Sequence, residues 1–65
     1  MANKQVTVSL IIPTLNEAGC IERIIGEVPK EYVDEIIVVD GHSTDGTIDI
    51  VKKIQGVRLI MQESK

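Results

Sequence analysis

Four consecutive apolar residues, Ile36 to Val39, lie in the middle of the sequence between Glu35 and Asp40. A β-branched run without polar alternation is typical of a parallel strand that is covered on both faces. Parallel strands need crossover connections, usually helices, so this run restricts the chain to an α/β architecture. We therefore expect Ile36 to Val39 to form the central strand of a small parallel sheet.

A strand and a helix are expected before this run. The alternation and the β-branched run of Val6 to Ile12 predict a strand. We expect Pro13 to end it, because proline cannot donate to a strand ladder. A helix follows, with Thr14 and Glu17 as a capping box, Asn16 as a competing N-cap, and Pro29 as its stop. Its apolar stripe has helical spacing: Ile21, Ile24, Ile25 and Val28.

A second helix and a third strand are expected after the central strand. Gly41 to Gly46 is a loop of turn-forming residues, and Gly56 is well placed as the C′ residue of the helix. Val57 to Met61 reads as the third strand. The apolar stripe of this helix is Thr47, Ile50, Val51 and Ile54.

The order strand, helix, strand, helix, strand makes two consecutive βαβ units. Right-handed crossovers then give a parallel sheet of order 3-2-1, with both helices on one face if the sheet grows in one direction. The fold class is α/β, the β-α-β-α-β half of a doubly wound, three-layer nucleotide-binding fold. We expect residues 1–65 to form a single truncated nucleotide-binding half-domain.

Such a half-domain leaves one sheet face without helices and one sheet edge without a neighbour. With 65 residues, the chain has little core, and its single cysteine, Cys20, cannot close an internal disulfide. We expect a homo-oligomer formed through the open edge or the uncovered face. A small self-associating α/β module that binds no ligand is the alternative function.

Charge and composition exclude several other classes. A formal net charge of −3, with Tyr32 as the only aromatic residue, argues against nucleic-acid binding. The longest apolar run has four residues, whereas a membrane span needs about 20, and we see no targeting peptide. A lone cysteine fits a reducing compartment, so we expect a cytoplasmic protein.

Ligands of open parallel sheets bind beyond the carboxyl ends of the strands. In this chain the candidate ligand-binding residues are therefore those after Ile12 and Val39. The dinucleotide fingerprint G-x-G-x-x-G is absent after the first strand. Gly41 and Gly46 have the spacing of a Walker A loop, but Thr47 stands where that loop requires lysine. Both a complete NAD enzyme and a P-loop enzyme are therefore disfavoured.

Three motifs resemble the amino-terminal part of inverting family 2 glycosyltransferases: P-T-L-N-E at 13–17, E-I-I-V-V-D at 35–40 and S-T-D-G-T at 43–47. The nearest resemblance is to the dolichol-phosphate (polyprenol-phosphate) mannosyltransferase branch. It implies an A-type glycosyltransferase (Rossmann-like) fold that binds a UDP- or GDP-sugar. Carried over by position, the nucleotide-binding residues would be Pro13, Leu15 and Glu17 at the base and ribose, with Val39, Asp40 and Gly41 facing the base.

The resemblance also implies that this segment is less than half of such an enzyme. Family members hold Mg²⁺ or Mn²⁺ with an aspartate-rich D-x-D motif on a later strand, and their catalytic base and acceptor site come later still. The sequence to Lys65 offers no catalytic residue and no metal ligand set. We therefore expect weak nucleotide-sugar binding and no sugar transfer to an acceptor such as a polyprenol phosphate from this chain alone.

Structural roles compete with the binding roles of several residues. For Glu17 the alternative to a ligand contact is a role as a helix cap, and the two roles can coexist. For Asp40 the alternative is a role as a turn or cap residue. Ser43 to Gly46 is favoured as the N-terminal cap of the second helix, although that end could attract an anion. His42 is expected to be a solvated loop residue, and Cys20 to pack rather than react.

Overall fold

Three strands and two helices make up residues 7–63, the part of the chain that the computed structural model describes. None of the helices in this part has the length and hydrophobicity needed to cross a membrane. The elements alternate along the chain: β1 (Ser9–Thr14), α1 (Ile21–Gly26), β2 (Glu35–Asp40), α2 (Thr47–Lys52) and β3 (Val57–Met61).

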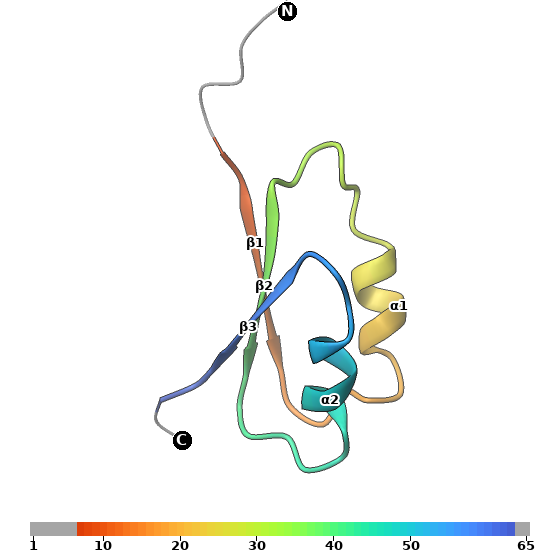
Figure 1. The fold of residues 1–65 in the computed structure, drawn as a ribbon, viewed down its shortest axis with the longest axis vertical. Helices are drawn as coiled ribbons and strands as arrows, with labels where there is room; N and C mark the ends of the chain where they lie inside the picture. The colour runs from red at the N-terminus through yellow and green to blue at the C-terminus, as the bar shows by residue number, and fades with distance from the viewer. Residues whose placement is uncertain (1–6, 64–65) are drawn as a thin grey trace, which may run out of the picture.

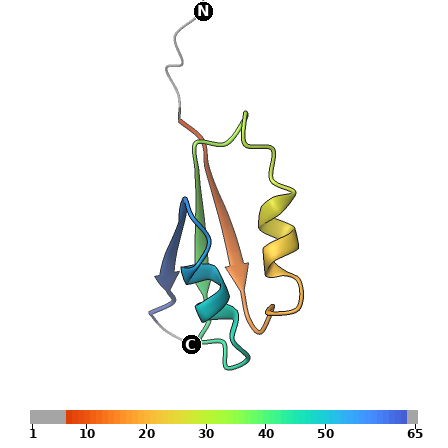
Figure 2. The same cartoon turned by 45° about the vertical axis from the view of Figure 1, so that its right-hand side comes forward.

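The sheet has the order β1-β2-β3, and both pairs of strands are parallel. In the register, Ile12 pairs with Val38, and Val38 pairs with Leu59. Both helices lie on the same side of the sheet in two views of the ribbon (Figures 1 and 2). The structure thus confirms the α/β class, the sheet order and the placement of the helices.

The hydrophobic core lies between this sheet face and the two helices. Alternate residues of β2 point into it, which buries Ile36 and Val38 and leaves Ile37 and Val39 half-buried on the other face. Each fully buried aliphatic side chain contributes about 1.5–3 kcal/mol of transfer free energy. The buried core residues come from both helices and the central strand: Ile21, Ile25, Ile36, Val38 and Val51.

The second sheet face carries no helix among the described residues. Ile11 of β1 is 59% exposed on it, and Ile60 of β3 is 39% exposed. The expectation that the central strand is covered on both faces is therefore not met within residues 7–63, because both helices lie on one face. The uncovered face that the topology predicts is present.

The prediction that Pro13 ends the first strand was wrong. β1 runs through Pro13 to Thr14, and Pro13 pairs in register with Val39. Because β1 is an edge strand, a proline there removes no hydrogen bond that a second neighbouring strand would need. β1 also begins later than expected, at Ser9; Val6, the expected start, lies outside the described residues.

The expected capping box of the first helix was also wrong. α1 begins at Ile21 after Cys20, and no side chain caps it. Thr14 is still part of β1, and a turn in which the Glu17 carbonyl accepts the N–H groups of Cys20 and Ile21 leads into the helix. Of the expected apolar stripe, Ile24 is the exception, since its side chain is exposed.

The apolar stripe of the second helix is confirmed. Thr47 and Val51 are fully buried, and Ile50 and Ile54 pack against the core. α2 itself ends at Lys52, and the N–H group of Ile54 bonds to the Val51 carbonyl in one further, tighter turn.

Candidate functional site

A cavity of about 540 Å³ opens at the carboxyl ends of β1 and β2. The loop after β1 and the loop after β2 meet at this end of the sheet (Figure 1). The carboxyl ends of two parallel neighbours thus form one wall, as the rule for open α/β sheets requires. Six residues line the cavity: Pro13, Thr14, Leu15, Glu17, Gly41 and Gln62.

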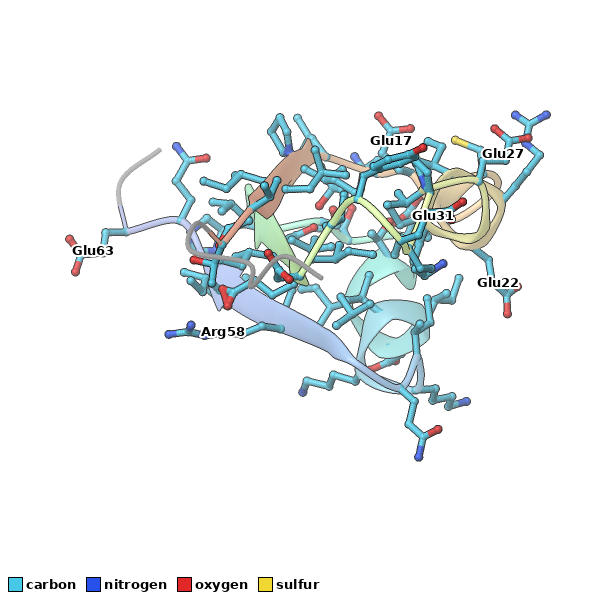
Figure 3. The ribbon with its side chains drawn as sticks, turned by 90° about the horizontal axis from the view of Figure 1, so that it is seen from above. Glu17, Glu22, Glu27, Glu31, Arg58 and Glu63 are labelled. Carbon is cyan, nitrogen blue, oxygen red and sulfur yellow. The ribbon has the colours of Figure 1, made fainter. Side chains whose placement is uncertain are left out.

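Four of the six residues predicted from the sequence line this cavity: Pro13, Leu15, Glu17 and Gly41. Leu15 is 59% exposed, which leaves an apolar surface at the opening. Glu17 is half-buried and projects outward from the segment between β1 and α1 (Figure 3). Because the lining contains one carboxylate and no cationic side chain, it is better suited to hydroxyl and imide N–H donors than to a phosphate.

The other two predicted residues, Val39 and Asp40, lie beside and behind the cavity. Val39 is half-buried on the uncovered sheet face, next to Pro13 in the register. The side chain of Asp40 is 0% exposed. The structure therefore brings all six residues to one end of the sheet, but only four of them to the cavity surface.

The Asp40 carboxylate is the centre of a buried hydrogen-bond network. Its Oδ1 accepts the hydroxyl groups of Thr14 and Ser43, both at 2.7 Å, and its Oδ2 accepts the Ser43 N–H at 2.7 Å. Burial opposes ionisation, but the hydrogen bonds from Ser43, Thr14 and the backbone of His42 outweigh it and lower the pKa of Asp40. Asp40 is thus an ionised group that ties the end of β1 to the loop after β2.

Glu17 and Cys20 form a second, more exposed contact. The Cys20 thiol lies 3.2 Å from Glu17 Oε1 and donates to it. This hydrogen bond, followed by desolvation and the charge of Glu17, raises the pKa of Cys20. A thiol that is held protonated is a poor nucleophile, which agrees with the expected packing role of Cys20.

Two cavity residues were missed by sequence reasoning. Thr14 was interpreted as a helix cap, and only the register that pairs it with Asp40 shows its place at the end of β1. Gln62 follows β3, and its N–H donates to the Asp40 carbonyl at 2.8 Å. The exposed ring of His42 contacts the Gln62 carbonyl, Nε2 to O, at 2.8 Å. No sequence motif marks Gln62.

A second cavity, of about 570 Å³, lies at the opposite end of the sheet and between the helices. Its lining includes the apolar residues Ile25, Ile54 and Val57 and the cationic residues Lys30 and Lys53. It lies away from the carboxyl ends of the strands, where parallel sheets bind their ligands, so the smaller cavity is the better candidate site.

Residues 7–63 hold no group of three or more histidine, cysteine, aspartate or glutamate side chains that could bind a metal ion. The two aspartates near the site, Asp40 and Asp45, already accept hydrogen bonds from neighbouring protein donors. The donor set in this part of the chain therefore does not fit a divalent cation.

Comparison of the sequence with known proteins shows the family of this chain. Residues 9–65 match the model of Glycosyl transferase family 2. The chain is 46% identical over 55 residues to an uncharacterized glycosyltransferase of Rickettsia felis, covering 85% of this chain and 19% of that protein. No solved structure matches the chain with significance.

Two relatives carry more specific names. One is the dolichyl N-acetyl-alpha-D-glucosaminyl phosphate 3-beta-D-2,3-diacetamido-2,3-dideoxy-beta-D-glucuronosyltransferase of Methanococcus voltae, 43% identical over 53 residues, covering 74% of this chain and 16% of that protein. The other is the glucosyl-3-phosphoglycerate synthase of Mycobacterium tuberculosis, 38% identical over 60 residues, covering 88% and 18%. The chain thus spans about a fifth of the length of the curated relatives it matches. Since the family model covers nearly all of the sequence, this chain belongs to glycosyl transferase family 2.

Proposed function

We propose that this chain is the nucleoside-binding segment of an inverting glycosyltransferase that transfers a sugar from a UDP- or GDP-sugar to an acceptor such as a polyprenol phosphate. The observation that carries the proposal is the cavity at the carboxyl ends of β1 and β2, because four residues singled out from the sequence line it. Its volume of about 540 Å³ falls within the range of about 300–1,000 Å³ that is typical of small-molecule sites.

Each cavity residue has a role that follows from its chemistry. The Glu17 carboxylate accepts hydrogen bonds from a ribose hydroxyl or a base imide. Pro13 and Leu15 provide an apolar surface for a planar base, and Gly41 adds no side chain to the lining. A β-carbon at Gly41 would lie 3.8 Å from Leu15 Cδ1 and 3.4 Å from Gln62 Oε1, so a larger side chain would extend into the cavity.

Asp40 and Val39 support the binding surface from behind. Asp40 fixes Thr14 and Ser43, and Val39 packs beside Pro13 on the uncovered face. Asp40 therefore acts through its neighbours, while Glu17 is the carboxylate that meets the nucleoside.

Sugar transfer itself requires parts that the described residues do not supply. The Mg²⁺ or Mn²⁺ that the family resemblance implies finds no fitting donor set in residues 7–63, so we derive no step through a metal. We propose that the metal and the acceptor are held by other parts of a longer enzyme and that this chain alone transfers no sugar. The names of two relatives support this division, because one refers to a dolichyl-linked sugar phosphate and the other to a phosphoglycerate.

We also propose that the donor is bound in the cytoplasm. The support is the single cysteine of the sequence, which cannot form an internal disulfide. We propose that the parent enzyme belongs to the polyprenol-phosphate branch because of the resemblance of the three motifs at 13–17, 35–40 and 43–47.

Binding is tested by titrating the ¹⁵N-labelled chain with UDP, GDP, ADP and CDP and following the backbone amide signals. We expect the amides of Glu17 and Gly41 to shift with UDP or GDP and the core amide of Val38 to stay in place. Glu17→Gln should weaken binding, and Glu31→Gln, an equivalent change at an exposed turn away from the cavity, should not. Absence of any shift at millimolar nucleotide would refute binding by this chain.

Self-association is the second candidate function, and the uncovered sheet face favours it. Ile11 and Ile60 are exposed there, flanking the half-buried side chains of Ile37 and Val39. Arg58 projects from β3 toward the outside and pairs with a neighbouring glutamate, Arg58 Nη1 to Glu35 Oε2, at 3.8 Å (Figure 3). A second copy of the chain could cover the side chains of Ile11, Ile37, Val39 and Ile60, because contiguous exposed apolar surface is typical of interaction sites.

Sedimentation velocity distinguishes this function from nucleotide binding. We expect a concentration-dependent dimer that Ile11→Glu shifts to monomer, whereas Glu22→Gln on the exposed side of α1 leaves it unchanged. A strict monomer at millimolar concentration would exclude self-association.

A further inference from the structure

Three consecutive backbone N–H groups of the loop after β1 bond to side chains of the S-T-D-G-T motif. The Asn16 N–H donates to Ser43 Oγ at 2.8 Å, the Glu17 N–H to Thr47 Oγ1 at 2.8 Å, and the Ala18 N–H to Asp45 Oδ2 at 3.1 Å. The position of the loop that carries Glu17 is thus set by side chains of a segment 27 or more residues further along the chain.

One contact runs in the other direction. The side chain of Asn16 accepts the Thr44 N–H at Oδ1, at 2.9 Å. Asn16 itself has a φ of +54°, a left-handed conformation that asparagine tolerates better than most residues. The two loops therefore hold each other through reciprocal hydrogen bonds.

Thr47 and Asp45 form the inner part of this connection. Thr47 is fully buried at the start of α2, and its hydroxyl donates to Asp45 Oδ1 at 2.5 Å. The Thr47 N–H donates to the same oxygen at 3.1 Å. With its proton directed to Asp45, the Thr47 hydroxyl presents its lone pairs to the Glu17 N–H.

The Asp45 carboxylate is consequently occupied on both oxygens by protein donors. Oδ1 serves Thr47, and Oδ2 serves Ala18. The hydroxyl of Thr47 is the main reason that the pKa of Asp45 is lowered, so the group is ionised at neutral pH. Neither Asp45 nor Thr47 lines the cavity.

We propose that Thr47 and Asp45 are positioning residues for the nucleoside site: they anchor the Glu17 and Ala18 N–H groups and thereby hold the Glu17 carboxylate at the cavity. This inference rests on the proposed function, which it deepens by assigning a role to a motif that does not itself meet the ligand. The side chains of Ser43, Asp45 and Thr47 accept hydrogen bonds from the backbone of the neighbouring loop.

The test compares four variants of the chain. Thr47→Val removes the hydroxyl at nearly constant volume, and Asp45→Asn replaces one acceptor oxygen by a donor. Thr47→Ser keeps the hydroxyl and serves as the rescue variant. Asp49→Asn makes the same change as Asp45→Asn at an exposed position of α2 and is the matched control.

The first readout is amide hydrogen exchange and does not involve a ligand. A hydrogen bond of about 0.5–1.5 kcal/mol corresponds to a roughly two- to tenfold change in protection. We expect protection to fall by this factor at the Glu17 amide in Thr47→Val and at the Ala18 amide in Asp45→Asn. The core amide of Val38 should change less in both variants. Equal losses at the loop and core amides, or none at the loop amides, would overturn the positioning role. If Thr47→Val does not fold, Asp45→Asn at the exposed position decides the question in the same way.

The second readout is the Kd of the nucleotide that binds the unaltered chain. We expect Thr47→Val and Asp45→Asn to weaken binding about tenfold, and Thr47→Ser and Asp49→Asn to leave it unchanged. Unchanged affinity in Thr47→Val or Asp45→Asn, with loop protection lost, would overturn the inference while leaving the proposed function intact. No binding of any nucleotide to the unaltered chain would overturn the proposed function and the inference that rests on it, whereas the exchange data would still report on the loop contacts.

Discussion

Replacing Asp40 by alanine should remove a large part of the stability of this fold. The change deprives the buried Thr14 hydroxyl and the Ser43 N–H of their acceptor at 2.7 Å. A buried donor left without a partner costs about 1–3 kcal/mol, so we expect a loss of about 2–6 kcal/mol. A domain of this length has a total free energy of unfolding of about 3–10 kcal/mol. Asp40→Ala should therefore unfold at a clearly lower urea concentration than the unaltered chain.

Urea unfolding followed by far-ultraviolet circular dichroism measures this loss. Glu31→Ala, at an exposed turn, is the control, and it should change the free energy of unfolding by no more than about 0.5 kcal/mol. Asp40→Asn should lose less than Asp40→Ala, because its oxygen can still accept the Ser43 N–H while its amide group donates to the hydroxyl oxygens. If Asp40→Ala were as stable as Glu31→Ala, the assignment of Asp40 as the centre of the network would be refuted.

The pH dependence of stability provides an independent test of the role of Asp40. Because the pKa of Asp40 is lower in the folded chain than in the unfolded chain, its ionisation stabilises the fold above pH of about 4. That contribution is lost as the pH falls through the folded-state value. The stability difference between the unaltered chain and Asp40→Asn should therefore shrink between about pH 5 and pH 2. A constant difference across this range would show that the charge of Asp40 contributes nothing.

Other residues give predictions that probe the cavity, the turns and the thiol separately. Leu15→Tyr should tighten nucleotide binding, measured by calorimetry, because stacking of a base on an aromatic ring contributes about 1–3 kcal/mol; unchanged affinity would mean that the base lies elsewhere. Gly56→Ala should lower the free energy of unfolding by about 1 kcal/mol, because Gly56 has a φ of +82°. Gly26→Ala in α1, where a β-carbon meets nothing within 4 Å, should not lower it. Equal effects of the two changes in urea unfolding would contradict this reasoning. Cys20 should react faster with a disulfide reagent at pH 8 in Glu17→Ala than in the unaltered chain, because loss of the carboxylate lowers the raised thiol pKa; a slower reaction would disprove the contact.

The architecture could be predicted from the sequence because its main signals are local. The apolar run of β2 predicts a strand and the helical spacing of Thr47 and Val51 predicts the buried side of α2, and the structure has both, although only alternate residues of β2 are buried. Pro13 was misjudged because tolerance of a proline depends on whether the strand lies at a sheet edge, which is a property of the whole sheet. The capping box failed for a similar reason, since the Thr14 hydroxyl has a partner on another strand.

The candidate site was predictable in its position but not in the roles of its residues. Parallel topology alone places the residues after β1 and β2 at one end of the sheet, and Glu17, Leu15 and Gly41 accordingly meet at the cavity. The partners of Asp40 and the contribution of Gln62 depend on the strand register and on the path of the chain after β3. No spacing in the sequence encodes these tertiary contacts.

The acidic residues near the cavity have different roles, which makes the proposed nucleoside site compatible with a net charge of −3. Asp40 is buried behind the cavity and Asp45 contacts the neighbouring loop, so both carboxylates already accept hydrogen bonds from protein donors. Glu17 alone brings a carboxylate to the cavity lining. A single acceptor beside an apolar wall can recognise a ribose or a base, but it cannot hold a diphosphate against like charge. This lining agrees with the proposal that the segment binds the nucleoside end of a sugar donor, whereas the phosphate end would need cationic groups that the cavity lining does not contain.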